Sequence, residues 1–446
     1  MNNSDEKRME LQREALSTLL ENRRLILNWG TGVGKSRVAV EAVRRLSGHG
    51  EKILLLVNET AHKDGWRREF GKALGEIGEE LYDSLTVECY ASAYKYRGTG
   101  WDLIVMDEGH HMRSELKTEI LSTFTSDYVL VLSATLSEKG DGDALLYTLE
   151  RTFGPFKQLF FNVQEAIDAK ILGKPQIYVH RIPLDLVTAP QTVCFDWGNP
   201  AKRVEVECPL SDFPLYAGHT NRYPSMSLRM SCSAREGYDF LTGKIDFFRK
   251  QYNAARKAAG LTGSAPDTGR SLVEYNRLVQ YGNRRKMLLG QCKTTFARWL
   301  LSTPSLLGKK YICFCSDVDQ GEELGGENII SSRRDDCATV IEAFNEGRIR
   351  SLFAVGMIQE GANLEGIEAG VIVQLGGKER VFVQKFGRAL RARQPVQHII
   401  VASDTRDEDY LRTALENIDR KYIKEIDWGE RLGFTRRALR KTPLPV

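Results

Sequence analysis

The sequence predicts an α/β protein with two parallel-sheet domains in tandem, an inserted segment and a helical C-terminal tail. Short apolar runs alternate with helical stretches up to about residue 172, and the same alternation returns after about residue 303. Strands separated by helices favour parallel pairing with crossover helices. The chain has 446 residues, 42% of them hydrophobic, which is too long for one ordinary core and suits two. We therefore place one domain at 1–172 and the other at 173–446.

The first domain is expected to begin with a helix at 11–20, and a glycine-rich turn is expected between its first strand and a helix at 36–46. The run at 52–57 is continuously apolar, which is typical of a strand buried on both faces of a parallel sheet. The predicted strands of this domain are 24–28, 52–57, 101–106 and 128–132.

The second domain is expected to contain an irregular, partly helical segment at about 180–300. Within it, 193–209 has β character, 234–259 is a basic helix and 260–270 is rich in turn residues. The α/β alternation then resumes. The predicted strands are 310–314, 351–355, 370–375 and 398–402, and the predicted helices are 336–345 and 381–391.

Two basic segments have more than one interpretation. The helix at 234–259 is either an element that grips or separates nucleic-acid strands or an ordinary solvated helix. The C-terminal tail carries Arg436, Arg437, Arg440 and Lys441, and it is either a nucleic-acid-binding arm or a solvated face.

The bulk composition excludes several classes of protein. A net charge of +4 permits nucleic-acid binding without arguing for it. The eight cysteines include no C-x-x-C pair, which argues against a zinc module or a disulfide framework. The sequence contains neither a signal-peptide pattern at its N-terminus nor a run of about 20 apolar residues. These features predict a soluble protein of a reducing compartment, the cytoplasm.

The strongest local signal is the run Gly30-Thr-Gly-Val-Gly-Lys-Ser36, between a predicted strand and a predicted helix. Glycines let backbone N–H groups close on phosphate oxygens, and the helix N-terminus adds a positive dipole end. Lys35 would reach the β- and γ-phosphates, and the Ser36 hydroxyl would hold Mg²⁺. Trp29 replaces the usual first glycine. The predicted ATP contacts of the loop are Thr31, Gly32, Val33, Gly34, Lys35 and Ser36.

An acidic pair, Asp107 and Glu108, follows the apolar strand at 101–106 directly. Carboxylates at the tip of a parallel strand suit metal binding and water activation. Asp107 would bind Mg²⁺, and Glu108 would orient or deprotonate the attacking water. An aspartate that only caps a helix gives the same local pattern, and the phosphate loop in the same domain makes that the weaker interpretation.

These motifs resemble those of the superfamily 2 helicases, in DEAD/DEAH-like, Swi/Snf-like or phage-type form. The resemblance implies two RecA-like domains with ATP split between them, and it implies that His110 couples the ATP state to a Ser-Ala-Thr motif with Ser133 and Thr135. The segments that carry it are 30–36, 54–60 with 66–70, 90–92 with Lys95, 107–110, 133–135, 311–316, 359–364 and 384–391.

Motif VI, at 384–391, has its four defining residues on one face of a helix, at positions i, i+3, i+4 and i+7. The resemblance implies that Gln384, Arg388 and Arg391 act in catalysis and that the two guanidinium groups stabilise charge on the γ-phosphate. It also implies ATP contacts from Gly361 and an adenine contact from Gln12, although the usual arginine is not at its expected spacing from Gln12.

The resemblance favours DNA as the partner for three reasons. These are the W-x-x-E-F segment at 66–70, the E-G-x-N-L form of motif V at 360–364, and DEGH in place of DEAD at 107–110. Possible partners among replication or recombination proteins, and a phage or mobile-element origin acting in the host cytoplasm, are further expectations. The candidate nucleic-acid contacts, each of which is otherwise only a polar surface residue, are Lys63, Arg67, Tyr90, Ser92, Lys95, Ser316 and Asn363.

Three alternatives to a DNA helicase or translocase stay open. The first is an RNA-dependent ATPase of the same superfamily. The second is the motor subunit of a restriction or repair complex, and the third is a nucleotide-gated binding protein that barely hydrolyses ATP. The presence of Glu108, Arg388 and Arg391 argues against the last of these, because a pure switch can lose them.

Overall fold

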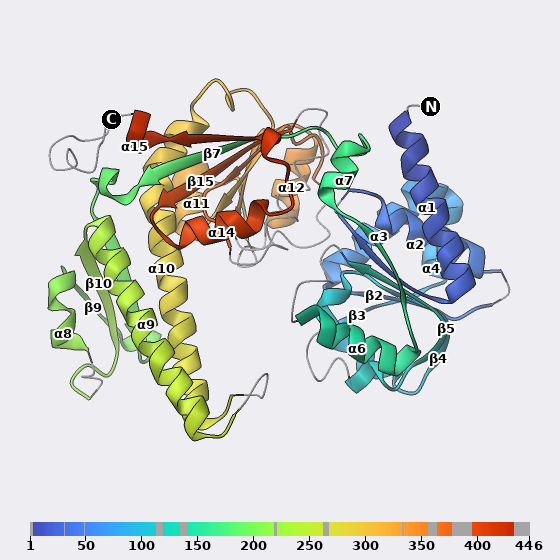
Figure 1. The fold of residues 1–446 in the computed structure, drawn as a ribbon, viewed down its shortest axis with the longest axis horizontal. Coiled ribbons are helices and arrows are strands. Elements are labelled where there is room, and N and C mark those ends of the chain that lie inside the picture. The colour runs from blue at the N-terminus through green and yellow to red at the C-terminus, as the bar shows by residue number, and fades with distance from the viewer. Residues whose placement is uncertain are drawn as a thin grey trace.

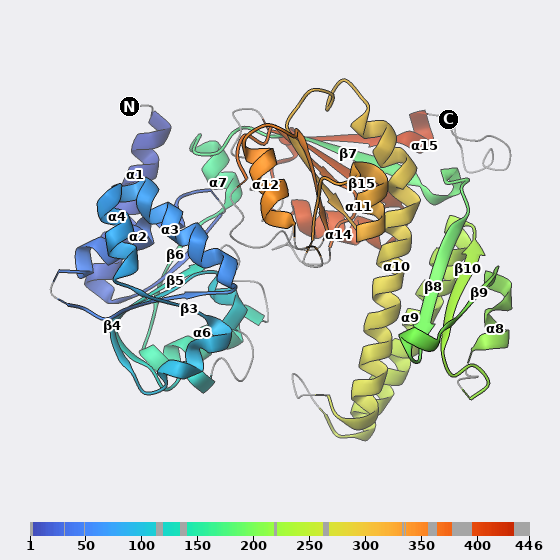
Figure 2. The ribbon, with the colours of Figure 1, turned by 180° about the vertical axis from the view of Figure 1, so that it is seen from behind.

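The computed structural model describes residues 3–30, 32–48, 50–112, 119–133, 141–217, 221–261, 267–331, 334, 336–355, 364–376 and 395–431. Two α/β bodies follow each other along the chain, and a third, smaller body projects from the second (Figure 1). Figure 2 shows from behind how the long helices α9 (Ala234–Ala258) and α10 (Gly269–Leu301) lead from the second sheet to this projection.

The first body is built on a six-stranded sheet of order β3-β2-β4-β5-β1-β6, in which every pairing is parallel. Alternate strand residues face opposite helical layers. The Leu25 and Leu27 side chains enter the cluster under the helices on one face, while Ile26 packs under α6 on the other. The strands are β1 (Arg24–Trp29), β2 (Ile53–Val57), β3 (Thr86–Cys89), β4 (Gly100–Met106), β5 (Thr125–Ser133) and β6 (Lys157–Phe161).

Helices cover both faces of this sheet (Figure 1). One layer contributes Ala15 and Leu19 to the same buried cluster as Val38 and Phe70, and the other layer contributes Leu149. The helices are α1 (Asn3–Asn22), α2 (Lys35–Leu46), α3 (Thr60–Leu74), α4 (Glu76–Asp83), α6 (Asp141–Phe153) and α7 (Val163–Asp168).

The second body contains a seven-stranded, wholly parallel sheet of order β12-β13-β11-β14-β15-β7-β16. Together the two sheets confirm the predicted pair of parallel-sheet α/β domains. The strands are β7 (Gln176–Pro183), β11 (Tyr311–Cys315), β12 (Ile329–Ile330), β13 (Ser351–Val355), β14 (Ala369–Ile372), β15 (Val396–Ser403) and β16 (Ile423–Asp427), and the helices are α11 (Val318–Gly325), α12 (Cys337–Asn345), α14 (Arg406–Leu415) and α15 (Trp428–Arg431).

Strand β7 was not predicted, because its partners are distant in sequence. It pairs with β15 over eight residues, from Gln176↔Val396 to Pro183↔Ser403, and with β16 on its other side. The second sheet therefore includes a strand that precedes the inserted segment, so the segment is an insertion within this sheet and not a linker before it.

The inserted segment is more regular than the sequence predicted. It forms a three-stranded sheet of order β8-β10-β9 against helices α9 and α10, of which α10, with 33 residues, was missed. Its sequence contains Gly282 and Gly290, which lower helix propensity. Gly290 is required by packing, since a Cβ there would lie 2.3 Å from Oγ of Ser316. The strands are β8 (Gln191–Trp197), β9 (Val204–Pro209) and β10 (Met226–Cys232).

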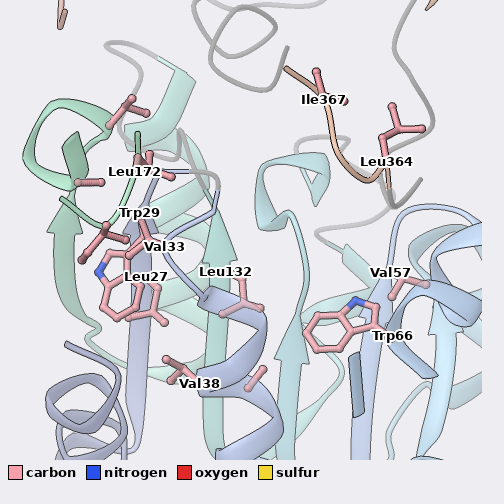
Figure 3. Close-up of a cluster of buried hydrophobic side chains, with 14 of the residues drawn as sticks. Leu27, Trp29, Val33, Val38, Val57, Trp66, Leu132, Leu172, Leu364 and Ile367 are labelled. Atoms are coloured by element: carbon pink, nitrogen blue, oxygen red, sulfur yellow. The ribbon is translucent and has the colours of Figure 1, made fainter. Parts of the chain in front are cut away.

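The two larger bodies touch through polar and apolar contacts. The backbone N–H of Asp419 donates to Oε1 of Gln164 at 2.9 Å, and Lys72 lies 3.6 Å from Glu365. Leu364 and Ile367 of the second body belong to the same buried cluster as Trp66 of the first. Figure 3 shows Leu364 and Ile367 of the second body above Val57 and Trp66 of the first.

Several expectations concern residues outside the described ranges. The tail residues Arg436, Arg437, Arg440 and Lys441 lie in 432–446, and the core of the turn-rich stretch lies in 262–266. The eight cysteines are all free. No helix in the described parts of the chain combines the length and apolar character that a membrane span requires.

Candidate nucleotide-binding site

Three strands deliver the predicted motifs to one edge of the first sheet. Strand β5 lies between β1 and β4, with Asn28 of β1 opposite Ser133 and Met106 of β4 opposite Val131. All three strands run parallel, so the segments that follow β1 and β4 and the last residue of β5 meet at the carboxyl edge. Ligands of open α/β sheets bind at this edge.

The phosphate loop depends on glycine where it enters helix α2. Gly32 and Gly34 have φ of 89° and 110°, in the left-handed region that other residues rarely adopt. A Cβ on Gly34 would lie 2.3 Å from Nε2 of Gln12, so the predicted adenine-binding side chain rests on the loop. Lys35 donates a hydrogen bond of 2.8 Å from Nζ to the carbonyl of Trp29, so its ammonium lies along the loop.

Asp107 is held from three sides. Its backbone N–H donates to the carbonyl of Leu56 at 2.9 Å, its carbonyl accepts from the hydroxyl of Tyr90 at 2.7 Å, and its Oδ2 accepts from Nε1 of Trp66 at 2.8 Å. These contacts fix the carboxylate at the tip of β4. The next residue, Glu108, turns the chain with φ of 48°, an uncommon backbone conformation for a residue other than glycine.

His110 connects the acidic motif to the end of β5. Its Nδ1 lies 3.3 Å from Oγ of Ser133 and 3.4 Å from Oε2 of Glu108. The His110 and Ser133 side chains are both buried. The geometry thus places the predicted coupling pair in direct contact.

The predicted nucleic-acid contacts differ in accessibility. Tyr90 is only 1% exposed, and its hydroxyl binds the carbonyl of Asp107. It therefore stabilises the acidic motif from inside the domain, and its expected contact with nucleic acid is wrong. Ser316 donates to Oδ2 of Asp317 at 2.6 Å and lies against helix α10, while Ser92 is half-buried.

Lys63 and Lys95 lie on either side of Glu88, with Nζ–Oε distances of 3.0 and 3.2 Å. Burial of the Glu88 carboxyl raises its pKa, but hydrogen bonds from the Cys89 N–H and both lysines outweigh this and hold the pKa below its usual value. One carboxylate thus faces two cations at the end of β3. Arg67 forms an ion pair with Asp83 and lies 5.0 Å over the ring of Tyr82.

Some predicted site residues lie outside the described ranges. These are Thr31, Thr135, Gly361, Asn363, Gln384, Arg388 and Arg391. Their roles stay predictions.

Sequence reasoning did not assign a role to Trp66, although its W-x-x-E-F segment was noted. The available signal was an aromatic N–H donor on the helix that follows β2, next to the strand that carries Asp107.

The fold and this edge of the first sheet define a class of protein with two parallel-sheet domains in tandem and a phosphate loop beside an acidic motif. Comparison with known proteins agrees with this class. Residues 6–138 match the family model described as type III restriction enzyme, res subunit. The DNA 3'-5' translocase XPB2 of Sulfurisphaera tokodaii is 23% identical over 391 residues, which cover 86% of this chain and 78% of that protein.

Two solved structures align with most of the chain. That of S. cerevisiae Dbp5 bound to RNA and ADP BeF3 has a TM-score of 0.51 at 12% identity, covering 96% of this chain and 93% of that chain. That of the Pyrococcus furiosus Hef helicase domain has a TM-score of 0.44 at 15% identity, covering 92% of this chain and 97% of that chain. The two sequence matches indicate a superfamily 2 helicase, as the motifs predicted. The likeness to the Dbp5 structure agrees with the predicted fold of tandem RecA-like domains. The comparisons give no support to a phage origin.

Proposed function

We propose that the chain is a DNA-dependent ATPase that couples ATP hydrolysis between its two RecA-like domains to movement on DNA or remodelling of DNA. The observation that carries this proposal is the meeting of the phosphate loop, Asp107 and the His110–Ser133 pair at one sheet edge. The domain division belongs to the proposal: 1–172 binds ATP, and 173–446 supplies the residues that complete the site.

The residues at this edge fit a magnesium–nucleotide. The left-handed backbone of Gly32 and Gly34 is the conformation with which such loops turn N–H groups toward phosphate oxygens, and the Lys35 ammonium lies along the same loop. Asp107 and Ser36 offer the hard oxygen ligands that Mg²⁺ prefers. Bound Mg²⁺ would neutralise charge on the phosphates.

Each residue at the edge has a proposed task. Glu108 orients or deprotonates the attacking water, while Lys35 binds the phosphates. Arg388 and Arg391, which belong to the second domain by sequence, are proposed to stabilise charge on the γ-phosphate. His110 and Ser133 transmit the state of the nucleotide to the end of β5.

DNA is the preferred partner because the matched relative XPB2 is a DNA translocase and the sequence has the DNA-type motif forms described above. The matched family model is named for a restriction enzyme subunit, which favours the motor subunit of such a complex as the second candidate. Lys63 and Lys95 are proposed to contact the nucleic-acid backbone.

The test is the steady-state ATPase rate with no nucleic acid, single-stranded DNA, duplex DNA, a branched junction or RNA. Glu108→Gln is the blank. Stimulation by DNA above stimulation by RNA supports the proposal and ranks the DNA structures. Greater stimulation by RNA makes the RNA-dependent ATPase the better interpretation. A rate that no nucleic acid raises above the blank would contradict a self-sufficient motor and favour the partner-dependent subunit.

A further inference from the structure

We propose that Trp66 is a positioning residue for the metal-binding carboxylate: its indole N–H holds Asp107 in the orientation that receives Mg²⁺ with the nucleotide. This inference rests on the proposed function and deepens it. It assigns a role in the ATP cycle to a side chain that belongs to neither the phosphate loop nor the acidic motif.

The placement of Trp66 follows from the fold. Strand β2 pairs with β4, with Leu56 opposite Met106, and the Asp107 N–H continues this ladder by donating to the Leu56 carbonyl. Helix α3 begins at Thr60, three residues beyond the end of β2, and carries Trp66 back over the carboxyl edge of the sheet. The indole Nε1 thereby comes within 2.8 Å of Asp107 Oδ2.

The indole ring itself is fixed. Trp66 is 5% exposed, and its ring lies 6.3 Å from that of Phe70, which in turn meets the ring of Tyr82 at 5.6 Å. Because packing fixes the indole N–H, its hydrogen bond restricts the rotation of the Asp107 carboxylate. The hydrogen bond also reaches a group that is charged when it binds metal, and such bonds are stronger than neutral ones.

The need to satisfy a buried indole N–H does not by itself explain this contact. Trp101, in β4 of the same domain, is 7% exposed, and its Nε1 has no hydrogen-bond partner in the described part of the chain. The domain therefore accommodates a buried indole without an acceptor. At Trp66, the acceptor is the carboxylate that the site assigns to Mg²⁺.

The experiment replaces Trp66 by Phe, which retains an aromatic ring and removes the N–H. In the non-hydrolysing Glu108→Gln chain, binding of a fluorescent ATP analogue is titrated with Mg²⁺. We expect Trp66→Phe to raise the half-saturating Mg²⁺ concentration about 10-fold, the effect of losing one charged hydrogen bond. Analogue binding in EDTA should be unchanged. An unchanged Mg²⁺ requirement would overturn the proposal.

Trp101→Phe is the matched control, because it also removes a buried indole N–H from the first domain. It should leave the Mg²⁺ requirement unchanged. In the Asp107→Asn background, Trp66→Phe should have no further effect, since the residue acts through that carboxylate. Equal effects in both backgrounds would show that Trp66 acts elsewhere, and would also overturn the proposal.

A further measurement separates positioning from general loss of structure. With Glu108 intact, the ATPase rate of Trp66→Phe should recover at high Mg²⁺, whereas damage to the fold would not be rescued. If Trp66→Phe does not fold, 5-fluorotryptophan spectra of the unsubstituted chain keep the proposal testable. One of its six tryptophan resonances should move when Mg²⁺ joins the ADP complex, and should not move in Asp107→Asn. Absence of such a resonance would contradict the role.

The proposed function and this inference fail in different ways. If the Glu108→Gln parent itself shows no Mg²⁺-dependent nucleotide binding, the proposed function is wrong. If the parent binds and Trp66→Phe binds equally well at every Mg²⁺ concentration, only the role of Trp66 is wrong.

Discussion

Nδ1 of His110 lies 3.3 Å from Oγ of Ser133, and both side chains are buried. The histidine follows β4 and the serine ends β5, so this contact joins the acidic motif to the strand beside it. Oε2 of Glu108 lies 3.4 Å from the same nitrogen. A movement of the Glu108 side chain therefore acts on His110 and, through it, on Ser133 of β5.

Ser133→Ala should bind ATP normally and lose stimulation by DNA. Removing one hydrogen bond between buried groups weakens the coupling by about 1 kcal/mol, so we expect the stimulated ATPase rate to fall roughly 5- to 10-fold. The basal rate should change little. Ser126→Ala, near the other end of β5, is the control, because the Ser126 hydroxyl donates to the nearby Tyr128 carbonyl at 2.7 Å, away from the acidic motif. Equal stimulation in Ser133→Ala and the control would contradict a coupling role.

Arg391→Ala should leave ATP binding nearly intact and slow hydrolysis by about 10³-fold, because it removes a charge that acts on the γ-phosphate in the transition state. Single-turnover hydrolysis and nucleotide binding measure the two steps separately. Arg412→Ala is a matched control, since Arg412 is highly exposed on α14. Normal hydrolysis by Arg391→Ala would show that the two-domain catalytic site is wrong.

Gln12→Ala should reduce the preference for ATP over GTP. The Gln12 amide rests against Gly34, where it is placed to reach a base bound beside the loop. Loss of one base-specific hydrogen bond changes the ratio of kcat/KM values about 10-fold. Arg13→Ala, at the exposed neighbouring position on α1, should retain the preference. Equal ratios for Gln12→Ala and the unsubstituted chain would remove Gln12 from the adenine site.

Lys293→Met should destabilise the second body. Nζ of Lys293 lies 2.5 Å from Oδ2 of Asp407 and also donates to the Val373 carbonyl and Oε1 of Gln374. Both members of the pair are buried, and burial lowers the pKa of Lys293. Removing the lysine leaves the buried Asp407 carboxylate without its counter-ion, which lowers the free energy of unfolding by about 3–5 kcal/mol.

Chemical denaturation measures this effect, and the same helix supplies its control. Arg298 on α10 pairs with Glu323, and both side chains are more than half exposed. Arg298→Met should therefore cost less than about 1 kcal/mol. Similar losses in the two variants would show that the buried pair contributes no more than a surface pair.

Acid should destabilise the chain through a pair of buried histidines. Nε1 of Trp428 donates to Nδ1 of His180, whose Nε2 lies 2.9 Å from Nδ1 of His398. This arrangement suits neutral imidazoles. Burial, reinforced by Arg431, lowers the pKa of His180 to about 4, and burial with its neighbour His180 lowers the pKa of His398 to about 3.

In the unfolded chain both imidazoles take up protons below about pH 6.5, so the unfolded state binds more protons there. The free energy of unfolding should thus be retained above pH 6.5 and fall as the pH drops towards 4. Each histidine contributes up to about 1.4 kcal/mol per pH unit. His398→Phe should reduce this slope between pH 6 and 4, with the pH-independent region above 7 as the internal reference. An unchanged slope would contradict the prediction.

The sequence by itself determined that there are two parallel-sheet domains, and it determined the local chemistry of the first. The loop at 30–36 was identifiable because glycine, lysine and serine within seven residues, between an apolar strand and a helix, contain most of what a phosphate site requires. Asp107 and Glu108 were identifiable because the continuous apolar run before them marks the end of a buried strand. Parallel strands then bring both motifs to one edge.

Only the tertiary structure decided the contacts between residues far apart in sequence. Trp66 meets Asp107 across 41 positions, and β7 enters the second sheet through partners more than 200 residues away. The burial of Tyr90 and the length of α10 likewise depend on neighbours that no local pattern names. Spacing along the chain fixes which residues share a strand or helix, whereas packing of whole elements fixes which of them touch.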